Sequence, residues 1–261
     1  MKLSVIIPVY NEAAFLERCL KSLKPNPEVE YIVVDDGSTD GSTEVALKHS
    51  EALSAISQMD INRGVSFARN AGVTESKGDY VTFLDADDQM APDGAEDMLK
   101  AIDRFNGEEV IQLNHYRVHD GEAKTMPRYY ARQGFYELDN LPPKWATVWN
   151  KLYRRAFLEE HGIRFPIGQQ YDEDRQFNLA CLRYTGGIRC ASGMGIIKHF
   201  DNEASLCHTF DRKKAVGALT ALVDLLRQKN GREFDNLVRE CLIMHLNSPK
   251  FKRELGGPDD G

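Results

Sequence analysis

Short apolar runs alternate with amphipathic stretches along the first 108 residues of the chain. Val, Ile and Tyr are concentrated in four of these runs, which predicts strands over Lys2–Ile7, Val29–Val34, Tyr80–Leu84 and, more weakly, Ala55–Met59. Apolar residues three or four apart predict the intervening helices, one capped by Asn11, two over 42–53 and Ser66–Glu75, and one beginning near Pro92. Such alternation is typical of an α/β fold with a mostly parallel sheet and right-handed crossovers.

The pattern changes after residue 108. We expect a strand over Glu109–Asn114, a hairpin or loop through 141, and helices over Arg154–His161 and Glu173–Tyr184. Two amphipathic helices follow over Arg212–Lys229 and Arg232–Leu246, and we expect them to pack on the main domain rather than lie on a membrane. Their expected inner faces are Val216, Leu219, Leu222, Val223 and Leu226, then Phe234, Leu237, Val238, Cys241 and Leu242.

These boundaries predict one domain in two halves, residues 1–108 and 109–205, followed by C-terminal helices and a disordered tail over 206–261. A chain of 261 residues that is 42% hydrophobic and 28% charged can form a packed core. Its net charge of −7 argues against nucleic acid as a partner, because binding a phosphate backbone needs a basic surface.

No apolar run approaches the roughly 18 residues of a membrane-spanning helix, and Pro8 breaks the first run too early for a signal peptide. The five scattered cysteines form no C-x-x-C pair, which suits a reduced compartment. We therefore expect a cytoplasmic protein. The apolar C-terminal helices and the basic stretch Lys250–Arg253 leave peripheral contact with the inner face of the cell membrane open.

Three polar clusters follow three of the predicted strands. They are Pro8–Glu12, Asp35–Asp40 and Asp85–Asp88. Any one of them has an equally good explanation as turn chemistry, since Asp, Gly and Ser are common turn formers. Ligands of open parallel sheets bind beyond the carboxyl ends of the strands, so three clusters together favour a binding site.

The third cluster places three carboxylates within four residues, at Asp85, Asp87 and Asp88. Like charges this close repel unless a cation lies among them, and oxygen ligands favour Mg²⁺ or Mn²⁺. Neither G-x-G-x-x-G nor G-x-x-x-x-G-K-[ST] occurs, so a bound nucleotide would need its phosphates held by metal and by arginines. Arg63 and Arg69 are candidates, although either is equally well explained as a surface cation.

A known family carries this set of motifs. The sequence resembles the family-2 glycosyltransferases of the GT-A fold over Pro8–Glu12, Val34–Asp40, Asn62–Gly64, Ala68–Asn70, Leu84–Asp88, Val148–Arg155 and Tyr171–Phe177. The resemblance covers about residues 1–205. It implies a Rossmann-like α/β fold whose mostly parallel central sheet is flanked by helices, with a C-terminal helical extension.

The resemblance also implies roles for the residues of the first half. A nucleobase pocket would be lined by Pro8, Tyr10, Glu12 and Asp36, with the Asp36 carboxylate accepting a hydrogen bond from a uracil N–H. Gly64 would let the backbone approach the base, and Arg69 would lie near the donor.

Asp85, Ala86 and Asp87 match the D-x-D motif of the family. The resemblance implies that Asp85 faces the ribose and that Asp87 binds a Mn²⁺ or Mg²⁺ ion bridging the diphosphate. Asp88 is the alternative metal ligand. His199 lies where relatives carry a histidine or arginine near the diphosphate, so it is a further metal-site candidate, with Lys198 or Arg189 as alternatives.

Asp174 matches the general base of the family. Inversion needs a carboxylate on the acceptor side, and Asp174 opens a predicted helix whose dipole favours the ionised form. The alternative is that Asp172, Glu173 and Asp174 only cap that helix. Trp149 and the pair Tyr129–Tyr130 could stack on sugars or belong to the core. His115 and His119 are too far apart in a strand to share one ion.

The resulting hypothesis is a metal-dependent, inverting transferase that moves a sugar from a nucleotide donor, a UDP-sugar, to a hydroxyl. The resemblance implies a glycan or lipid-linked sugar as acceptor, in polysaccharide assembly. Two alternatives stay open. A sugar-phosphate nucleotidyltransferase is disfavoured because no N-terminal glycine-rich basic loop is present. A catalytically silent nucleotide-sugar-binding module would bind donor without turnover.

Overall fold

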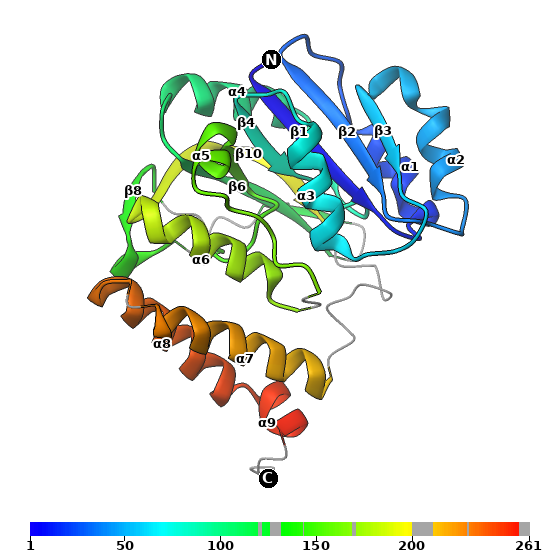
Figure 1. Cartoon of the computed structure of the whole chain (residues 1–261). Coiled ribbons are helices and arrows are strands. Elements are labelled where there is room, and N and C mark those ends of the chain that lie inside the picture. The colour runs from blue at the N-terminus through cyan, green and yellow to red at the C-terminus, as the bar shows by residue number, and fades with distance from the viewer. Residues whose placement is uncertain are drawn as a thin grey trace.

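A mixed β-sheet runs through the molecule (Figure 1). The computed structural model describes residues 1–119, 122–125, 132–142, 144–168, 171–199, 211–228 and 230–255. Their strands are β1 (Leu3–Val9), β2 (Val29–Asp35), β3 (Ala55–Gln58), β4 (Tyr80–Phe83), β5 (Gln89–Met90), β6 (Val110–His119), β7 (Glu122–Thr125), β8 (Gly134–Glu137), β9 (Lys151–Arg154) and β10 (Gly187–Lys198). The strand order is β3-β2-β1-β4-β9-β6-β10-β5, with β7 on β6 and β8 on β10.

Parallel pairing dominates the part of the sheet that the first half builds. Strands β3, β2, β1 and β4 are all parallel, and β6 is parallel to β10. The short strand β9 lies between β4 and β6 and is antiparallel to both, so it joins the two halves into one sheet. The predicted α/β class is therefore confirmed, while β5, β9 and β10 were not anticipated from the sequence.

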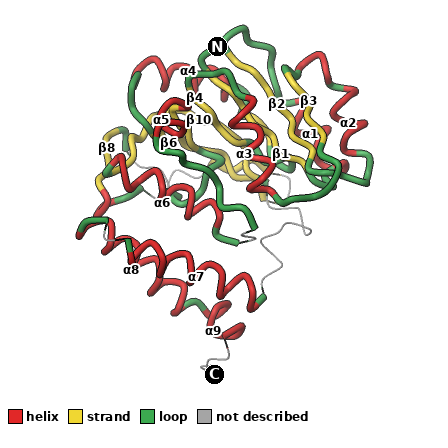
Figure 2. The backbone as a smooth tube through the Cα atoms, in the orientation of Figure 1, coloured by secondary structure: helices red, strands yellow, loops and turns green. Residues whose placement is uncertain are grey.

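The helices cover both faces of this sheet (Figures 1 and 2). They are α1 (Ala13–Lys21), α2 (Ser42–Lys48), α3 (Val65–Glu75), α4 (Gly94–Arg104), α5 (Arg155–Glu160), α6 (Glu173–Thr185), α7 (Arg212–Arg227), α8 (Arg232–Asn247) and α9 (Pro249–Leu255). Buried side chains of α1, α2 and α4 share one hydrophobic cluster, whereas Val73 of α3 and the buried side chains of α5, α6 and α8 belong to another. No helix in these ranges is long and apolar enough to cross a membrane.

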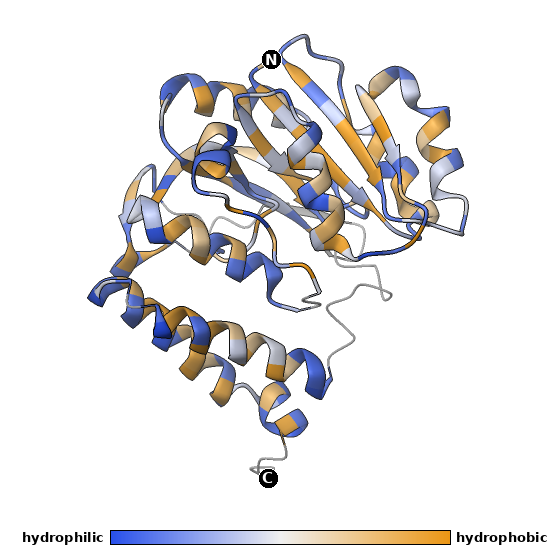
Figure 3. Ribbon diagram, viewed as in Figure 1, coloured by the Kyte–Doolittle hydropathy of each residue, from blue (hydrophilic) through white to orange (hydrophobic). Residues whose placement is uncertain are grey.

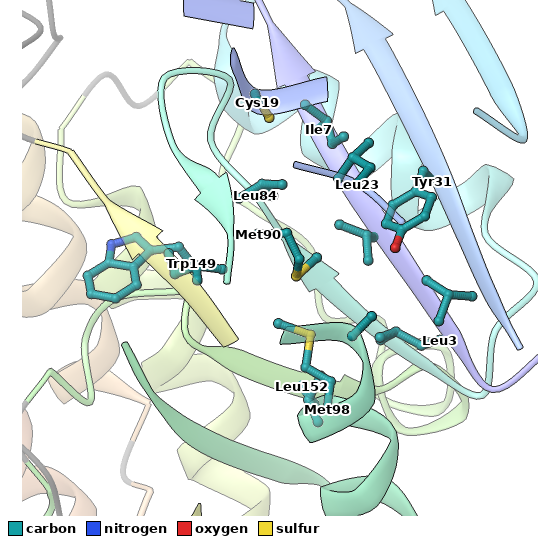
Figure 4. Close-up of a cluster of buried hydrophobic side chains, with 14 of the residues drawn as sticks. Leu3, Ile7, Cys19, Leu23, Tyr31, Leu84, Met90, Met98, Trp149 and Leu152 are labelled. Carbon is teal, nitrogen blue, oxygen red and sulfur yellow. The ribbon is translucent and has the colours of Figure 1, made fainter. Parts of the chain in front are cut away.

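Strand β1 is buried on both faces, which explains why its sequence is apolar apart from Ser4, whose hydroxyl donates to the buried Glu30 carboxylate. Leu3 and Ile7 point into the cluster that also contains Met98 and Leu152 (Figure 4). Ile6 points the other way and packs with Phe83 in the second cluster. Each such side chain contributes about 1.5–3 kcal/mol on burial. The site therefore rests on a strand that both layers hold in place.

Aromatic rings fill the second cluster beneath α6. The rings of Phe165 and Phe177 are stacked with centroids 4.0 Å apart, and Phe83 meets Phe165 edge-on at 5.1 Å. Helix α6 is thereby attached to β4, whose carboxyl end leads into the Asp85–Asp88 cluster. Such aromatic pairs stabilise by about 0.5–1.5 kcal/mol beyond the area they bury.

Helices α7–α9 form a further layer beyond α6 (Figure 3). In α8 the expected face is largely correct, since Phe234, Leu237, Val238 and Cys241 are buried. In α7 the expected face is wrong at Val216, which is 46% exposed, and the buried residues are Ala215, Ala218 and Leu222. The cause is α9, an unanticipated helix whose Phe251 packs against the two alanines.

A polar relay ties the start of α6 to α8. Asp172 precedes α6 in a left-handed conformation (φ 68°), and its carboxylate accepts from Arg175 Nη1. The same Nη1 lies 3.0 Å from Nε2 of the buried His245, whose Nδ1 lies 2.8 Å from the carbonyl of Cys241. Nε2 of His245 also lies 3.3 Å from Asp172 Oδ2, so the three side chains form one contact group.

Gly94 gives a test of the packing between α4 and β10. A Cβ at this position would lie 2.2 Å from the carbonyl oxygen of Gly195. We predict that Gly94→Ala lowers the free energy of unfolding by about 1–3 kcal/mol, measured by urea denaturation, because backbone must move to admit the methyl group. Gly134→Ala is the control, since its nearest heavy atoms are 4.0 Å away. Equal effects of the two changes would contradict the predicted close contact.

Candidate functional site

The three polar clusters meet at one edge of the sheet. Val9 of β1 lies opposite Asp35 of β2, and Ile6 lies opposite Phe83 of β4. Because these three strands are parallel, the segments that follow them leave on the same side. The predicted convergence of the clusters is therefore present in the structure.

Part of the first two clusters is turn chemistry. The Asp40 carboxylate accepts from the amides of Ala13 and Ser42, at the starts of α1 and α2. Asn11 was expected to cap the first helix, which is wrong, because α1 begins at Ala13 with Glu12 at the cap position. Asn11 instead adopts φ 54°, and its side chain accepts from the Thr39 amide at 2.9 Å. These bonds lock the β1 and β2 loops together.

Asp36 is buried and faces the loop before α3. Its carboxylate accepts hydrogen bonds from the amides of Arg63 at 3.0 Å and Gly64 at 2.6 Å. Burial raises the pKa of Asp36, and these two amide bonds oppose that shift. Gly37 keeps the two loops close, since a Cβ there would lie 2.8 Å from the backbone carbon of Ile61. Asp36 thus fixes the backbone at Gly64 (φ 95°), which sequence reasoning had linked to a nucleobase.

A cavity of about 300 Å³ opens beside these loops. Its lining residues are Pro8, Glu12, Val65, Arg69, Asp85, Ala86, Asp87, Thr147, Trp149, Glu173, Asp174 and Lys198. Seven of them are among the residues predicted from the sequence. The other predicted residues, Tyr10, Asp36, Gly64, Asp88 and His199, do not line it. Of these, Tyr10 is 45% exposed and Asp88 is fully buried.

Asp85, Asp87 and Asp88 form a compact carboxylate cluster. Each offers an oxygen, and these oxygens lie within 4.8 Å of one another. The ammonium group of Lys198 lies among them, 2.7 Å from Asp88 Oδ2 and 3.0 Å from Asp85 Oδ2. Burial raises the pKa of Asp88 to about 8, although Lys198 opposes the shift. Three oxygen ligands at this spacing fit a hard divalent cation such as Mg²⁺ or Mn²⁺.

Arg69 connects this cluster with the start of α6. Its guanidinium contacts Asp85 Oδ1 at 3.1 Å, Asp174 Oδ1 at 2.8 Å and Glu173 Oε1 at 3.4 Å. Burial alone would raise the pKa of Asp85, but Lys198 and Arg69 outweigh it and hold that pKa below its usual range. The side chain of Arg69 is itself buried, and it also lies over the ring of Phe165. One cation therefore bridges the D-x-D segment and the predicted base.

Asp174 points out of the first turn of α6 and into the cavity. Besides Arg69, its carboxylate accepts from the Val148 amide at 3.3 Å. Burial raises its pKa, and Arg69 opposes that shift. Burial and the nearby Asp174 raise the pKa of Glu173 to about 7. Asp174 gives no support to the alternative that these acids only cap α6, because its carboxylate contacts Arg69 and the Val148 amide, which belong to other segments.

Lys151 is a functional candidate that sequence reasoning missed. It is fully buried, and its ammonium donates to the carbonyls of Lys144 and Thr147 and to Asn150 Oδ1. Burial lowers its pKa to about 7. These bonds hold the loop that presents Thr147 and Trp149 to the cavity. In the sequence Lys151 lies in the segment Val148–Arg155 that carries the family resemblance, but nothing in the residue pattern indicates that its ammonium group is buried.

The remaining candidates take up other positions. His199 donates its backbone N–H to Asp88 Oδ1 at 2.8 Å, and its Nε2 lies 2.8 Å from Gln89 Oε1. His115 meets Trp149 edge-on at 4.6 Å, and burial lowers its pKa to about 4. Arg189 pairs with Glu108, and Arg63 lies over the ring of Phe67. Tyr129–Tyr130 and the side chain of His119 lie outside the described residues.

Sequence comparison places this geometry in a family. Residues 4–162 match the family described as Glycosyl transferase family 2. Glycosyltransferase GlyA of Streptococcus pneumoniae is 32% identical over 185 residues, covering 64% of this chain and 26% of the relative. Putative glycosyltransferase EpsH of Bacillus subtilis is 28% identical over 194 residues, covering 67% and 54%. The chain thus spans little more than half of EpsH and about a quarter of GlyA.

Solved structures agree on the fold. TarS residues 1–349 from S. aureus, in complex with UDP-GlcNAc, superimposes with a TM-score of 0.80 at 24% identity, covering 94% of this chain and 72% of that one. Mannosyltransferase PcManGT from Pyrobaculum calidifontis, in complex with GDP-Man and Mn²⁺, gives 0.66 at 20% identity, covering 98% and 74%. These likenesses confirm the GT-A fold. Because the family match covers more than half of the chain, this protein belongs to glycosyl transferase family 2.

Proposed function

We propose that this protein is an inverting glycosyltransferase that moves a sugar from a UDP-sugar to a hydroxyl of a growing polysaccharide. The observation that carries the proposal is the single cavity in which the carboxylates of Asp85 and Asp87 face that of Asp174. One relative is named poly(ribitol-phosphate) beta-N-acetylglucosaminyltransferase TarS, and it is 28% identical over 187 residues. That name and the TarS complex with UDP-GlcNAc support a UDP-sugar donor and a glycan acceptor.

The donor half in this proposal is residues 1–108. Asp36 shapes the nucleobase pocket through the Gly64 backbone, with Pro8, Tyr10 and Glu12 on the facing loop. Asp85 faces the ribose, and Asp87 is the metal ligand because it lines the cavity. Asp88, fully buried and bonded to the His199 amide, anchors the end of β10. His199 is a weaker ligand candidate, since its ring contacts Gln89.

The acceptor half is residues 109–205, with the helices after it as a cover. Asp174 takes the proton of the acceptor hydroxyl as the new bond forms, and the Val148 amide and Arg69 orient its carboxylate. When bound, a divalent ion would neutralise charge that builds up on the departing diphosphate. The acceptor hydroxyl belongs to a glycan or a lipid-linked sugar; the latter would bring the protein into peripheral contact with a membrane.

Asp174→Asn tests the base. We predict that the release of UDP from a panel of UDP-sugars, with acceptor present, falls by about 10²–10⁴-fold because an amide cannot take the proton. Donor affinity, measured by calorimetry, stays within about threefold, since Asn keeps the shape of the site. Asp224→Asn, which changes an exposed carboxylate of α7, is the control. Full turnover in Asp174→Asn would assign the base elsewhere.

Removal of divalent metal tests the donor side. We predict that UDP binds about tenfold or more weakly in EDTA than in Mn²⁺, because phosphate charge then faces Asp85 and Asp87 directly. Asp87→Asn should lower the affinity for UDP in Mn²⁺ by a similar factor. In EDTA the same substitution should change the affinity for UDP little. Isothermal calorimetry measures all four affinities. UDP affinity that is the same in both buffers would remove the metal from the proposal.

Arg69→Met tests the bridge between the two acidic groups. Loss of a buried cation that contacts three carboxylates should lower the free energy of unfolding by about 3–5 kcal/mol at pH 8. Without Arg69 the folded-state pKa values of Glu173 and Asp174 rise further above their unfolded values. The deficit should therefore shrink as the pH falls toward 5, where these acids become protonated in the folded state.

The matched control for this change is Arg164→Met, which removes a partly exposed arginine paired with Glu159. Its effect should stay within about 0.5 kcal/mol at either pH. Urea denaturation at pH 8 and pH 5 measures both variants. A deficit in Arg69→Met that is independent of pH would indicate lost packing rather than lost charge pairing.

A further inference from the structure

The ammonium group of Lys198 lies where the three carboxylates of Asp85, Asp87 and Asp88 converge. Its Nζ is 2.7 Å from Asp88 Oδ2, 3.0 Å from Asp85 Oδ2 and 3.9 Å from Asp87 Oδ1. The side chain is only 16% exposed. Lys198 therefore offsets the mutual repulsion of this cluster, together with Arg69, which contacts Asp85 alone of the three.

The backbone at Lys198 is fixed by its neighbours, whereas the side chain has rotatable bonds. Lys198 ends β10, where the preceding Ile197 pairs with Gln89 of β5 and the following His199 amide bonds to Asp88. The ammonium group is attached through four methylene groups with rotatable bonds. It also lines the cavity, with Nζ 5.9 Å from the ring centre of Trp149. A rotation of the side chain can move the charge from the carboxylates into this cavity while the strand keeps its place.

The ammonium group and a divalent ion cannot share this position. Mg²⁺ binds carboxylate oxygens at about 2.0–2.1 Å, so an ion held by Asp85 and Asp87 or Asp88 would lie well inside contact distance of the present Nζ. Two cations at that separation repel strongly in a partly buried site. Arg69 presents no such conflict, because its guanidinium is bonded on the far side of Asp85, to Oδ1 and to Asp174.

We propose that Lys198 is a built-in counterion that a divalent cation displaces from the carboxylate cluster, and that the displaced ammonium then pairs with the diphosphate of the donor. This inference rests on the proposed function, which supplies the metal and the nucleoside diphosphate. Lys198 would then make the site favour the metal ion together with a diphosphate over the metal ion alone. Metal alone must break the lysine contacts, whereas metal together with a diphosphate gives the lysine a new partner.

The proposal predicts cooperative binding. If Lys198 links the two sites, UDP raises the affinity for Mn²⁺ and Mn²⁺ raises the affinity for UDP by the same factor. Replacing the ammonium by a neutral group removes the competitor and the later phosphate partner together. Affinity for metal alone then rises, and the cooperativity falls.

The experiment is a titration of Mn²⁺ followed by its electron paramagnetic resonance signal, with and without UDP. Wild type should bind Mn²⁺ about tenfold or more tightly when UDP is present. Lys198→Met should bind Mn²⁺ alone about tenfold more tightly than wild type. UDP should then raise the Mn²⁺ affinity of this variant by about twofold at most. The control is Lys2→Met, because Lys2 also lies between two carboxylates, Glu28 and Asp103, but at the opposite end of β1. It should match wild type.

If Lys198→Met leaves the buried Asp88 without a cation and the variant does not fold, Lys198→Arg is the second variant. The guanidinium keeps the charge and binds carboxylates with two parallel hydrogen bonds, so Mn²⁺ should bind more weakly than in wild type. Unchanged Mn²⁺ affinity in both variants, with UDP still tightening it, would overturn the displacement and leave the metal-dependent transferase standing. If neither wild type nor any variant binds Mn²⁺ in the presence of UDP, both the displacement of Lys198 and the metal-dependent transferase are overturned.

Discussion

Mutual repulsion among five carboxylates governs the centre of this protein. Asp85, Asp87, Asp88, Glu173 and Asp174 lie around two cations, Arg69 and Lys198, in a site that is largely removed from water. Asp85 contacts both cations, which makes it the point where the two acidic groups are electrostatically joined. The loop after β4 supplies three of these acids, α6 supplies two, and α3 and β10 each supply one cation. This concentration of carboxylate oxygens is the feature on which the proposed binding of a divalent cation depends.

The positions of the acids could be predicted from the sequence, and Arg69 and Lys198 were named as candidates, but the contacts between these cations and the acids could not be predicted. Asp85–Asp88 directly follow a strand, and the parallel order of β1, β2 and β4 follows from the alternation of strands and helices. Lys198 is separated from Asp85 by 113 residues, and Arg69 from Asp174 by 105. Such contacts depend on how strands from the second half enter the sheet. Strand β9 is only four residues long, and β10 contains Gly193 and Gly195 with register shifts, so neither has a clear period of two.

Asp36 illustrates a different limit of prediction from sequence. The motif that contains it points to contact with a base, but both of its oxygens accept from the backbone of the following loop. The sequence identifies which position matters, whereas only the structure shows whether a side chain contacts a ligand or shapes the backbone that does. Lys151 is the reverse case, because a buried lysine that binds loop carbonyls has no signature in hydrophobic patterning. Helix α7 is a third example. Its inner face is formed by alanines that pack against Phe251, so residue size rather than hydrophobicity decides which side of the helix is covered.

The relay from Asp172 through Arg175 to His245 has a mechanical consequence. A slip of α8 by one helical turn, about 5.4 Å, would carry the imidazole beyond reach of the guanidinium. Asp172 would then keep its pairing with Arg175, which belongs to α6 itself, but would lose Nε2 of His245, which lies 3.3 Å from its Oδ2. The position of α8 is thus coupled, through His245, to the residue that directly precedes Glu173 and Asp174.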